Sequence, residues 1–333
     1  MITIGILGID HGHIFGMLGH LLARGATAKA WWTNGPAVPE QKFRATYPDL
    51  RQVEDRRAIL DDPEIDLILI AAVPADRAGL AIEAMEAGKD VMVDKPGCTT
   101  LDQLVALREA QARTGRIWSV NFSERFQVPA VARAEAMVAE GAIGRVVQVV
   151  TLAPHKQNLK TRPNWYFQRE RYGGILVDIG SHQIDQVLHF IGADQAEVLS
   201  AVVENTTRPE YPEFQDYGEA TLRTPGGHGF IRVDWFTPDG LPTWGDGRLF
   251  LLGTEGTIEV RKYTDIGQPH VTDRLYLVNG ERNERIDCAG GPLSYFDRLL
   301  ADIRDRTETA MSQAHPFTVM DVALRAQAMA EDA

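Results

Sequence analysis

The 333-residue sequence contains only two cysteines, Cys98 and Cys288, and it has no surplus of basic residues. Two cysteines cannot build a disulfide scaffold or an all-cysteine zinc site, and they fit a reducing cytoplasm. Lysine and arginine total 34 against 46 aspartates and glutamates, a net charge of −12, which argues against nucleic acid or an anionic membrane as partner. Apolar runs such as 67–73 are too short to cross a bilayer, and residues 1–8 do not resemble an export signal. We therefore expect a cytoplasmic globular protein of about two domains.

The first third of the chain alternates short apolar runs with segments of helical periodicity. The strand-like runs are 2–7, 28–33, 66–72, 90–94 and 117–122. Between them, apolar residues recur at helical spacing in segments such as 14–22 and 101–112, and glycines such as Gly25 and Gly88 follow as stops. Strands that alternate with helices of this length predict a parallel sheet with helices on both faces.

The pattern changes after about residue 122. The strand-like segments here are 146–152, 230–235, 249–252, 257–261 and 275–278, and closing helices are expected near 295–304 and 319–329. The last strand-like segment leads into Asn279-Gly280, a strong signal for a β-hairpin, which implies antiparallel pairing. We therefore predict an α/β domain at 1–121 followed by an α+β domain at 122–333.

The turn after the first strand is the first candidate site. A dinucleotide fold uses a G-x-G-x-x-G turn here, so that the backbone can approach a pyrophosphate at a helix N-terminus. Gly8 matches this pattern, but Asp10 and His13 stand at the other two glycine positions, so the segment can equally be an ordinary glycine-containing turn. Asp10 would repel a pyrophosphate unless it is paired, and His11 could offset its charge.

The same turn also supports a function of another class. His11 and His13 could bind a metal at the end of a strand in a (β/α) barrel, with Lys95, His155 and His182 completing the site of a metal-dependent hydrolase. The hairpins of the second half argue against a barrel, which needs strand–helix alternation throughout. A histidine pair that merely lines a helix start is also more common than a metal site.

The second candidate is Asp94-Lys95-Pro96, which follows the strand at 90–94. Ligands bind at the carboxyl ends of strands in open α/β sheets, and a lysine there is a mobile hydrogen-bond donor. Pro96 disfavours a helical backbone at Lys95, so the side chain is presented from an extended turn, and the bond between them can be cis. A solvated lysine before a loop is the plainer interpretation.

The third candidate is the segment 173–185. If it is helical, Asp178, His182 and Asp185 fall at i, i+4 and i+7 on one stripe. A carboxylate one turn from a histidine can fix its tautomer and raise its basicity. Gly180 costs about 1 kcal/mol relative to alanine but lets a ligand approach closely. The alternative is a buried histidine with an ion-pair neighbour.

Two of these segments resemble the Gfo/Idh/MocA family of oxidoreductases, which includes glucose–fructose oxidoreductase and inositol dehydrogenase. Residues 87–96, Ala-Gly-Lys-Asp-Val-Met-Val-Asp-Lys-Pro, are similar to the family's A-G-K-x-V-x-x-E-K-P. Residues 173–185 are similar to its G-G-x-x-x-D-x-G-x-H-x-x-D. The resemblance implies an N-terminal Rossmann domain, and a C-terminal domain with a large open mixed, mostly antiparallel sheet that commonly mediates homodimers or homotetramers. It also implies an NAD or NADP cofactor and hydride transfer to or from a sugar, cyclitol or similar polyhydroxylated molecule.

The resemblance also implies roles for individual residues. Lys95 takes the place of the family's catalytic lysine, Asp178 and His182 take the places of its aspartate and histidine, and Asp94 replaces its glutamate beside the nicotinamide ribose. Either Lys95 or His182 could act as the base. The expected cofactor contacts are Gly8, Ile9, Asp10, His11, Thr33, Asn34, Val73, Pro74, Asp94 and Lys95. The expected substrate contacts are His155, Arg162, Trp165, Tyr166 and His182, and no resident metal is expected.

Three departures from the family pattern qualify the cofactor contacts. The glycine turn is altered at two positions, and Ser123 stands where the family's Y-N-x-R-F motif has asparagine. Thr33-Asn34 stands where an acidic ribose ligand is usual, so NAD and NADP both stay open, with Lys42 and Arg44 as candidate phosphate partners. Because of Asp10 in the phosphate turn, a non-catalytic homologue that senses a cofactor or sugar is a second alternative.

Overall fold

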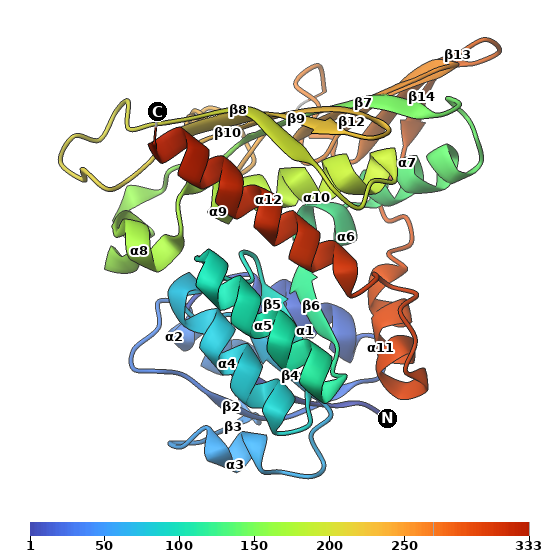
Figure 1. The fold of residues 1–333 in the computed structure, drawn as a ribbon. Coiled ribbons are helices and arrows are strands. Elements are labelled where there is room, and N and C mark those ends of the chain that lie inside the picture. The colour runs from blue at the N-terminus through green and yellow to red at the C-terminus, as the bar shows by residue number, and fades with distance from the viewer. Residues whose placement is uncertain (269, 333) are drawn as a thin grey trace. The chain divides into compact units, whose positions relative to one another are not determined.

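The computed structural model describes residues 1–268 and 270–332, and it divides into two compact units (Figure 1). The first unit comprises Met1–Asn121, Pro163–Gly173 and Ser294–Met320. The second unit comprises Phe122–Arg162, Gly174–Leu293 and the residues from Asp321 onward. None of the described helices is both long enough and apolar enough to span a membrane.

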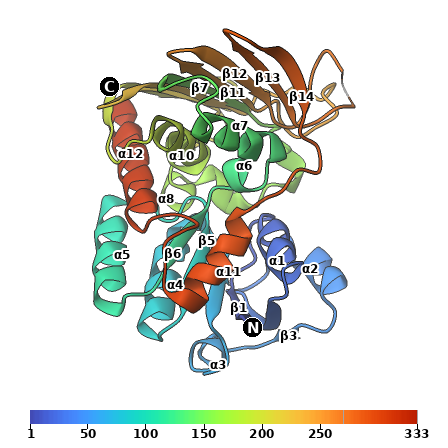
Figure 2. The same ribbon diagram turned by 90° about the vertical axis from the view of Figure 1, so that its right-hand side faces the viewer.

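The first unit is built on a six-stranded parallel sheet in the order β3-β2-β1-β4-β5-β6 (Figure 2). Its strands are β1 (Thr3–Leu7), β2 (Thr27–Trp32), β3 (Arg51–Gln52), β4 (Leu67–Ile70), β5 (Asp90–Asp94) and β6 (Trp118–Asn121). Its main helices are α1 (Ile14–Leu22), α2 (Glu40–Thr46), α3 (Arg57–Leu60), α4 (Pro74–Glu86), α5 (Leu101–Thr114), α8 (Arg169–Tyr172) and α11 (Tyr295–Asp305). The strand order reverses between β1 and β4, which is the switch point where a Rossmann fold binds its ligand.

Burial explains why this sheet forms. All four residues of β4 and all five of β5 are buried, as expected for strands covered by helices on both faces. The first helix after β5 is well delimited: the Thr100 hydroxyl accepts a hydrogen bond from the Gln103 backbone NH at 3.1 Å, and Gly115 ends α5 at a φ of 63°. The predicted Rossmann architecture is confirmed, and the open sheet is not the barrel that the metal-dependent hydrolase required.

The second unit is built on an eight-stranded sheet in the order β14-β13-β12-β11-β7-β10-β9-β8. Its strands are β7 (Val146–Pro154), β8 (Glu197–Glu204), β9 (Tyr217–Thr224), β10 (Gly227–Asp234), β11 (Arg248–Gly253), β12 (Gly256–Arg261), β13 (Arg274–Asn279) and β14 (Asn283–Asp287). Neighbouring strands are antiparallel except β7 and β10, which are parallel. The predicted mixed, mostly antiparallel sheet is therefore confirmed, including the hairpin that turns after Asn279.

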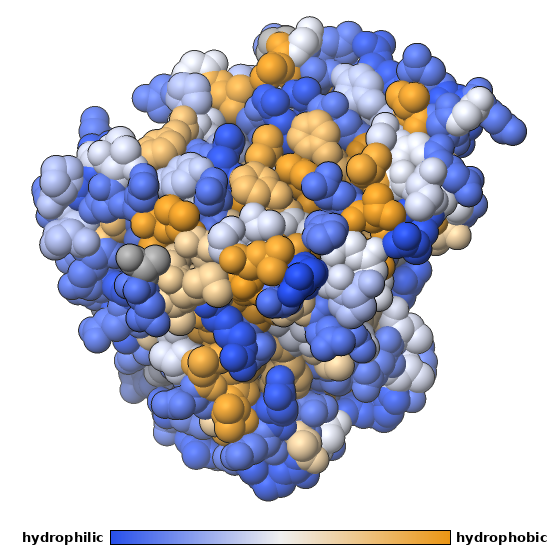
Figure 3. All heavy atoms as spheres, turned by 45° about the horizontal axis from the view of Figure 1, so that its top comes forward, coloured by the Kyte–Doolittle hydropathy of each residue, from blue (hydrophilic) through white to orange (hydrophobic). Residues whose placement is uncertain are grey.

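One face of this sheet carries helices. The helices are α6 (Ser123–Phe126), α7 (Pro129–Ala139), α9 (Ile175–Asp178) and α10 (Gly180–Ile191), and α12 (Ala314–Glu331) contributes residues to both units. The approach of α10 to β10 is close, because a Cβ at Gly229 would lie 2.5 Å from Cγ1 of Val187. The opposite face keeps apolar side chains exposed, among them Leu252 and Val278, and Figure 3 turns this face toward the viewer.

Candidate active site

The glycine turn follows β1 and is fixed by its neighbours. Gly8 has a φ of 81°, and a Cβ at this position would lie 2.4 Å from the Cβ of Ala72. The Gly8 backbone NH donates to the Trp32 carbonyl at 2.7 Å, and the His11 backbone NH donates to the Ala71 carbonyl at 2.9 Å. The one glycine that the sequence retains is therefore the one that the geometry requires.

A cavity of about 430 Å³ adjoins this turn at the carboxyl ends of the strands. Its lining includes Gly8, Trp32, Asn34 and Arg56. Beside it in sequence, the hydroxyl of Thr33 is buried and forms no hydrogen bond within the described part of the chain. A buried polar group without a partner costs about 1–3 kcal/mol, which a ligand could recover. The turn, the cavity and this hydroxyl together fit the adenosine half of a dinucleotide.

The other predicted cofactor contacts lie in this turn or at the start of α4. The Ile9 side chain is fully buried, so only its backbone is left for a ligand. Burial raises the pKa of Asp10 to about 6, against the lowering effect of Arg77, so the carboxyl is still mostly charged at pH 7. His11 does not pair with Asp10, contrary to our prediction, because its ring binds Asp94. Val73 precedes α4 and Pro74 begins it.

The predicted partners of a 2′-phosphate are engaged elsewhere. The Lys42 ammonium lies 4.7 Å from the centre of the Phe15 ring, and Arg44 binds Glu40. Arg56, which the sequence did not single out, lines the cavity instead. Its guanidinium lies 5.4 Å from the centre of the Trp32 ring and forms hydrogen bonds of 2.7 and 3.0 Å with Glu83. Arg56, which follows β3, therefore supplies the cation at this cavity. The spacing of residues along the sequence does not show that this segment lies beside the end of β2.

Asp94, the last residue of β5, lies at the centre of a hydrogen-bonded cluster. Its Oδ2 is 2.8 Å from Nδ1 of His11, and its Oδ1 is 2.8 Å from Nδ1 of His13. Nη2 of Arg77 lies 3.3 Å from Oδ2. Although burial alone would raise it, the pKa of Asp94 is held well below its usual range by His13, His11 and Arg77. Ligand atoms of His11, His13 and Asp94 all lie within 4.8 Å of one another, a spacing that could also hold a metal ion.

The turn that carries Lys95 is held from inside the unit. The peptide bond between Lys95 and Pro96 is cis, and the Lys95 side chain is buried. The fully buried Arg77 donates hydrogen bonds to the carbonyls of Asp94 at 3.0 Å and Pro96 at 3.1 Å, and also to the Lys95 carbonyl. A solvated lysine before a loop is therefore not what the structure contains.

In the second unit, the predicted stripe of α9 and α10 is helical. The two helices meet at Ile179, which itself has helical angles of −86° and −41°. Asp178 and His182 are both buried. The third member, Asp185, accepts hydrogen bonds of 2.7 and 2.8 Å from Nε and Nη2 of the buried Arg125, so this carboxylate holds α6 against α10.

A second buried charge cluster lies beside this stripe, and the sequence did not reveal it. Oε2 of Glu124 accepts hydrogen bonds from Lys262 Nζ at 2.7 Å and from Gln183 Nε2 at 3.0 Å. Its Oε1 lies 3.8 Å from Nε2 of His155. Burial raises the pKa of Glu124, but Lys262, His182 and His155 lower it by a larger amount. The pKa therefore lies below its usual range, and the group is a carboxylate. The partners are far apart in sequence, and no local pattern joins them.

The predicted substrate residues fall into two groups. His155 and Arg162 belong to the second unit, where both contact Trp235. The ring centroids of His155 and Trp235 are 5.4 Å apart, and the Arg162 guanidinium lies 4.5 Å from the centre of the Trp235 ring. Trp165 and Tyr166 belong to the first unit, with their rings 4.5 Å apart. Lys95 belongs to the first unit, whereas Asp178 and His182 belong to the second.

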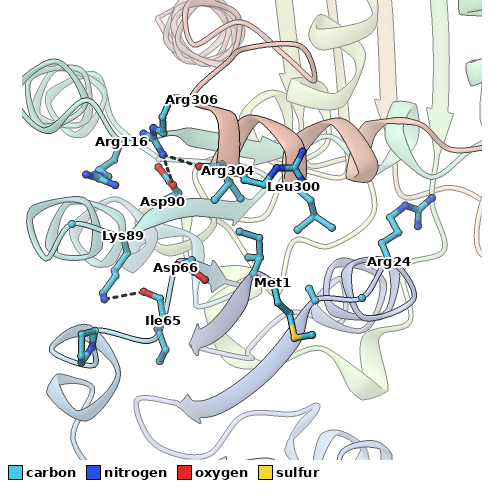
Figure 4. Close-up of a pocket in the computed structure, with 16 residues that line it drawn as sticks. Met1, Arg24, Ile65, Asp66, Lys89, Asp90, Arg116, Leu300, Arg304 and Arg306 are labelled. Atoms are coloured by element: carbon cyan, nitrogen blue, oxygen red, sulfur yellow. Dashed lines mark hydrogen bonds and ion pairs between the residues drawn. The ribbon is translucent and has the colours of Figure 1, made fainter.

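A larger cavity, of about 550 Å³, lies at the opposite edge of the first unit's sheet (Figure 4). Basic side chains line it, and two of them, Arg306 and Lys89, form hydrogen bonds within the fold. Arg306 binds Asp90 at 2.6 Å and the carbonyl of Gly115, which ends α5, at 2.7 Å. Lys89 donates to the carbonyls of Asp62 and Ile65 at 2.6 and 2.8 Å. Cations are favourable at helix C-termini, so the position of Arg306 is explained by the end of α5.

Comparisons with known proteins agree with this geometry. Residues 4–122 match the model of an oxidoreductase family with an NAD-binding Rossmann fold, and residues 131–259 match the GFO/IDH/MocA C-terminal domain. The chain is 32% identical to levoglucosan dehydrogenase of Pseudarthrobacter phenanthrenivorans over 95% of this chain and 82% of that protein. It is 27% identical to the NAD(+)-dependent scyllo-inositol 2-dehydrogenase of Bacillus subtilis over 62% of this chain and 58% of that protein. A solved structure of an oxidoreductase from Erwinia carotovora atroseptica has 41% identity and a TM-score of 0.96 over 99% of both chains.

Proposed function

Because the chain belongs to the Gfo/Idh/MocA family of oxidoreductases, we propose that it transfers a hydride between NAD or NADP and a CH–OH carbon of a sugar, cyclitol or similar molecule. The observation that carries the proposal is the burial of three titratable side chains, Lys95, Asp178 and His182, which are 4%, 4% and 2% exposed. Lysine and aspartate are seldom buried so deeply, and all three side chains stand in the segments 87–96 and 173–185 that resemble the family's motifs. The dehydrogenases to which the chain is similar act on levoglucosan and scyllo-inositol, which supports a polyhydroxylated substrate.

The first unit supplies the proposed cofactor contacts. They are Gly8, Ile9, Asp10, His11, Thr33, Asn34, Val73, Pro74, Asp94 and Lys95. The nicotinamide, when bound, accepts or donates the hydride. The residues on either side of the strand switch point would hold the two nucleotide halves, and the glycine turn would let backbone NH groups approach the pyrophosphate.

The acid–base chemistry is assigned to three side chains. As the hydride leaves the substrate carbon, His182 takes the hydroxyl proton, and Lys95 donates a hydrogen bond to the same oxygen. Asp178 orients His182 and stabilises its protonated form, which raises its basicity. Proton transfer of this kind contributes about 10²–10⁴-fold to rate. The lysine and the histidine can exchange the role of base.

The predicted C-terminal domain, residues 122–333, is proposed to bind substrate and to form oligomers. His155, Arg162, Trp165 and Tyr166 would contact the substrate, because aromatic surfaces with a few polar groups suit polyols. The open sheet face is proposed to pair in a homodimer or homotetramer. It carries exposed Leu252 and Val278 around a hollow of about 290 Å³. Two free cysteines and a net charge of −12 favour a cytoplasmic protein without nucleic-acid partners.

The experiment is a turnover assay with NAD and NADP over a panel of sugars and cyclitols. Lys95→Ala and His182→Ala should each lower turnover by about 10²-fold or more, while cofactor affinity, measured by nicotinamide fluorescence, changes little. Lys29→Ala, on β2, is the matched control and should leave both quantities unchanged. Equal turnover in wild type and Lys95→Ala would refute the assignment of Lys95. Cofactor binding without turnover over the whole panel would favour a sensor instead.

A further inference from the structure

The cavity at the amino ends of the first unit's strands has a positive lining, in a chain whose net charge is −12 (Figure 4). Among the residues that line it, Ile2 and Asp66 precede β1 and β4, and Asp90 begins β5. The cationic side chains of the lining are Arg24, Lys89, Arg116, Arg304 and Arg306, and the carboxylates are Asp66 and Asp90. Five cations against two carboxylates leave a surplus of three positive charges.

The fold uses both carboxylates. Oδ2 of Asp66 accepts a hydrogen bond from the Thr3 backbone NH at 2.8 Å. Oδ1 of Asp90 accepts a hydrogen bond from the Ile117 backbone NH at 2.8 Å, and its Oδ2 binds Arg306 at 2.6 Å. Because these oxygens are bound within the fold, the two carboxylates leave the other cations of the lining to a ligand.

The Arg116 side chain is the cation of the lining with donors to spare. Its backbone is fixed beside the end of α5, since its NH donates to the Thr114 hydroxyl and its carbonyl accepts from Gln111 Nε2, both at 3.3 Å. The half-buried side chain forms no hydrogen bond or ion pair within the described part of the chain, and Figure 4 draws no contact to it. A guanidinium has five N–H donors and stays charged, so an anion in the cavity would supply its acceptors.

Two further arginines pair with exposed carboxylates that do not line the cavity. Nε of Arg24 lies 2.8 Å from Asp297, and Nη2 of Arg304 lies 2.8 Å from Asp305. The side chains of Asp297 and Asp305 are 61% and 51% exposed, and that of Arg304 is 66% exposed. Exposed ion pairs contribute about 0–1 kcal/mol, so Arg304 can exchange its partner for another anion at little cost.

Helix dipoles account for only part of the surplus charge. The helices α1, α4 and α5 end beside the cavity, and their carboxyl ends, at about half a negative charge each, would offset about half of the surplus. Arg24 and Arg306 do bind carbonyls at the ends of α1 and α5, at 3.0 and 2.7 Å. Among the described residues, neither Arg116 nor Arg304 binds such a carbonyl, so the helices do not explain these two guanidiniums.

We propose that this cavity binds a phosphorylated small molecule, whose phosphate oxygens accept hydrogen bonds from the guanidiniums of Arg116 and Arg304. Planar guanidinium groups match phosphate oxygens in bidentate pairs. The cavity volume of about 550 Å³ falls within the range of about 300–1,000 Å³ that is typical of small-molecule sites. A Rossmann fold binds its dinucleotide at the carboxyl ends of the strands, so this site is separate from the proposed cofactor site and does not rest on the proposed function.

Calorimetry on the full chain, with pyrophosphate as the probe in about 0.1 M salt to screen long-range attraction, tests the proposal. Wild type should bind pyrophosphate saturably, and more tightly than citrate, which is also multiply charged but offers only carboxylate and hydroxyl oxygens. Arg116→Gln and Arg304→Gln should each weaken pyrophosphate binding about tenfold or more, as expected for a lost hydrogen bond between charged groups. The matched control is Arg113→Gln, which removes the same charge from an exposed arginine on α5 that binds Glu86, and it should change the affinity less than about twofold.

Amide NMR of the wild-type protein locates the bound probe. Gly25 and Gly88 line the cavity, and their amides should shift at pyrophosphate concentrations that leave the Gly8 amide unchanged. Four results would overturn the proposal: no saturable binding, equal affinity for citrate, an equal loss of affinity in the control and in the two cavity variants, or shifts confined to the turn at Gly8. The last result would place the probe at the proposed cofactor site instead.

Discussion

Replacing Lys262 with methionine should destabilise the protein by about 3–5 kcal/mol, because the substitution leaves a buried carboxylate without its cation. Lys262 Nζ lies 2.7 Å from Oε2 of Glu124, and the two side chains are 0% and 3% exposed. Methionine retains most of the apolar stem, so the loss is mainly electrostatic. At about 2–4 °C per kcal/mol for a unit of this size, the melting temperature should fall by roughly 10 °C.

The assay is thermal unfolding at pH 7, followed by circular dichroism. The double variant Glu124→Gln/Lys262→Met removes both charges and should regain most of the lost stability, since a buried pair costs desolvation energy on both sides. Arg282→Met breaks an exposed ion pair with Glu284 and is the control, with almost no expected change. The loss should also shrink as the pH falls toward 4.5, the ordinary pKa of a glutamate, because an unpaired Glu124 becomes protonated there. A melting temperature of Lys262→Met within about 1 °C of wild type would refute the reasoning.

Three further predictions concern the first unit. Gly8→Ala should weaken NADH binding by more than about tenfold, because its Cβ would lie 2.4 Å from that of Ala72 at a φ of 81°; unchanged fluorescence titrations would contradict this. The folded-state pKa of His11, about 3, lies below its ordinary 6.5, so its contribution to stability is present above pH 6.5 and is lost as the pH falls toward 3. His11→Asn should therefore flatten the dependence of urea unfolding on pH between 7 and 4, and an unaltered slope would count against it. Arg56→Gln should weaken NADP binding about 5–10-fold more than NAD binding, and equal effects in calorimetry would show that Arg56 does not reach a 2′-phosphate.

The parts of the fold that the sequence predicted are those with a strong local pattern. The strand at 90–94 was predicted with its observed bounds, because a wholly buried strand reads as one apolar run between breakers. The strands Glu197–Glu204 and Tyr217–Thr224 were missed. The first of these is mostly exposed, so no clear alternation of apolar and polar residues marks it. Its pairing with the next strand, rather than its own composition, defines it.

The candidate site divides in the same way. The resemblance pointed to Lys95, Asp178 and His182 because each sits in a contiguous motif. The ion pair of Glu124 with Lys262 depends on the sheet, which brings distant segments of the chain together. No spacing between nearby residues therefore predicts it. The pairing of His11 and His13 with Asp94 likewise depends on strand order, since the segments become neighbours only through the parallel sheet.

The most direct test of the account is to follow the hydride itself. The purified protein would be incubated with NAD or NADP and with inositols and sugars that carry deuterium on their CH–OH carbons, and the reduced cofactor would be analysed by mass spectrometry. We predict that the nicotinamide gains a single deuterium from at least one of these substrates, and that Lys95→Ala forms little of this product although it still binds cofactor. Reduced cofactor without deuterium, or bound cofactor that no polyol reduces, would contradict it.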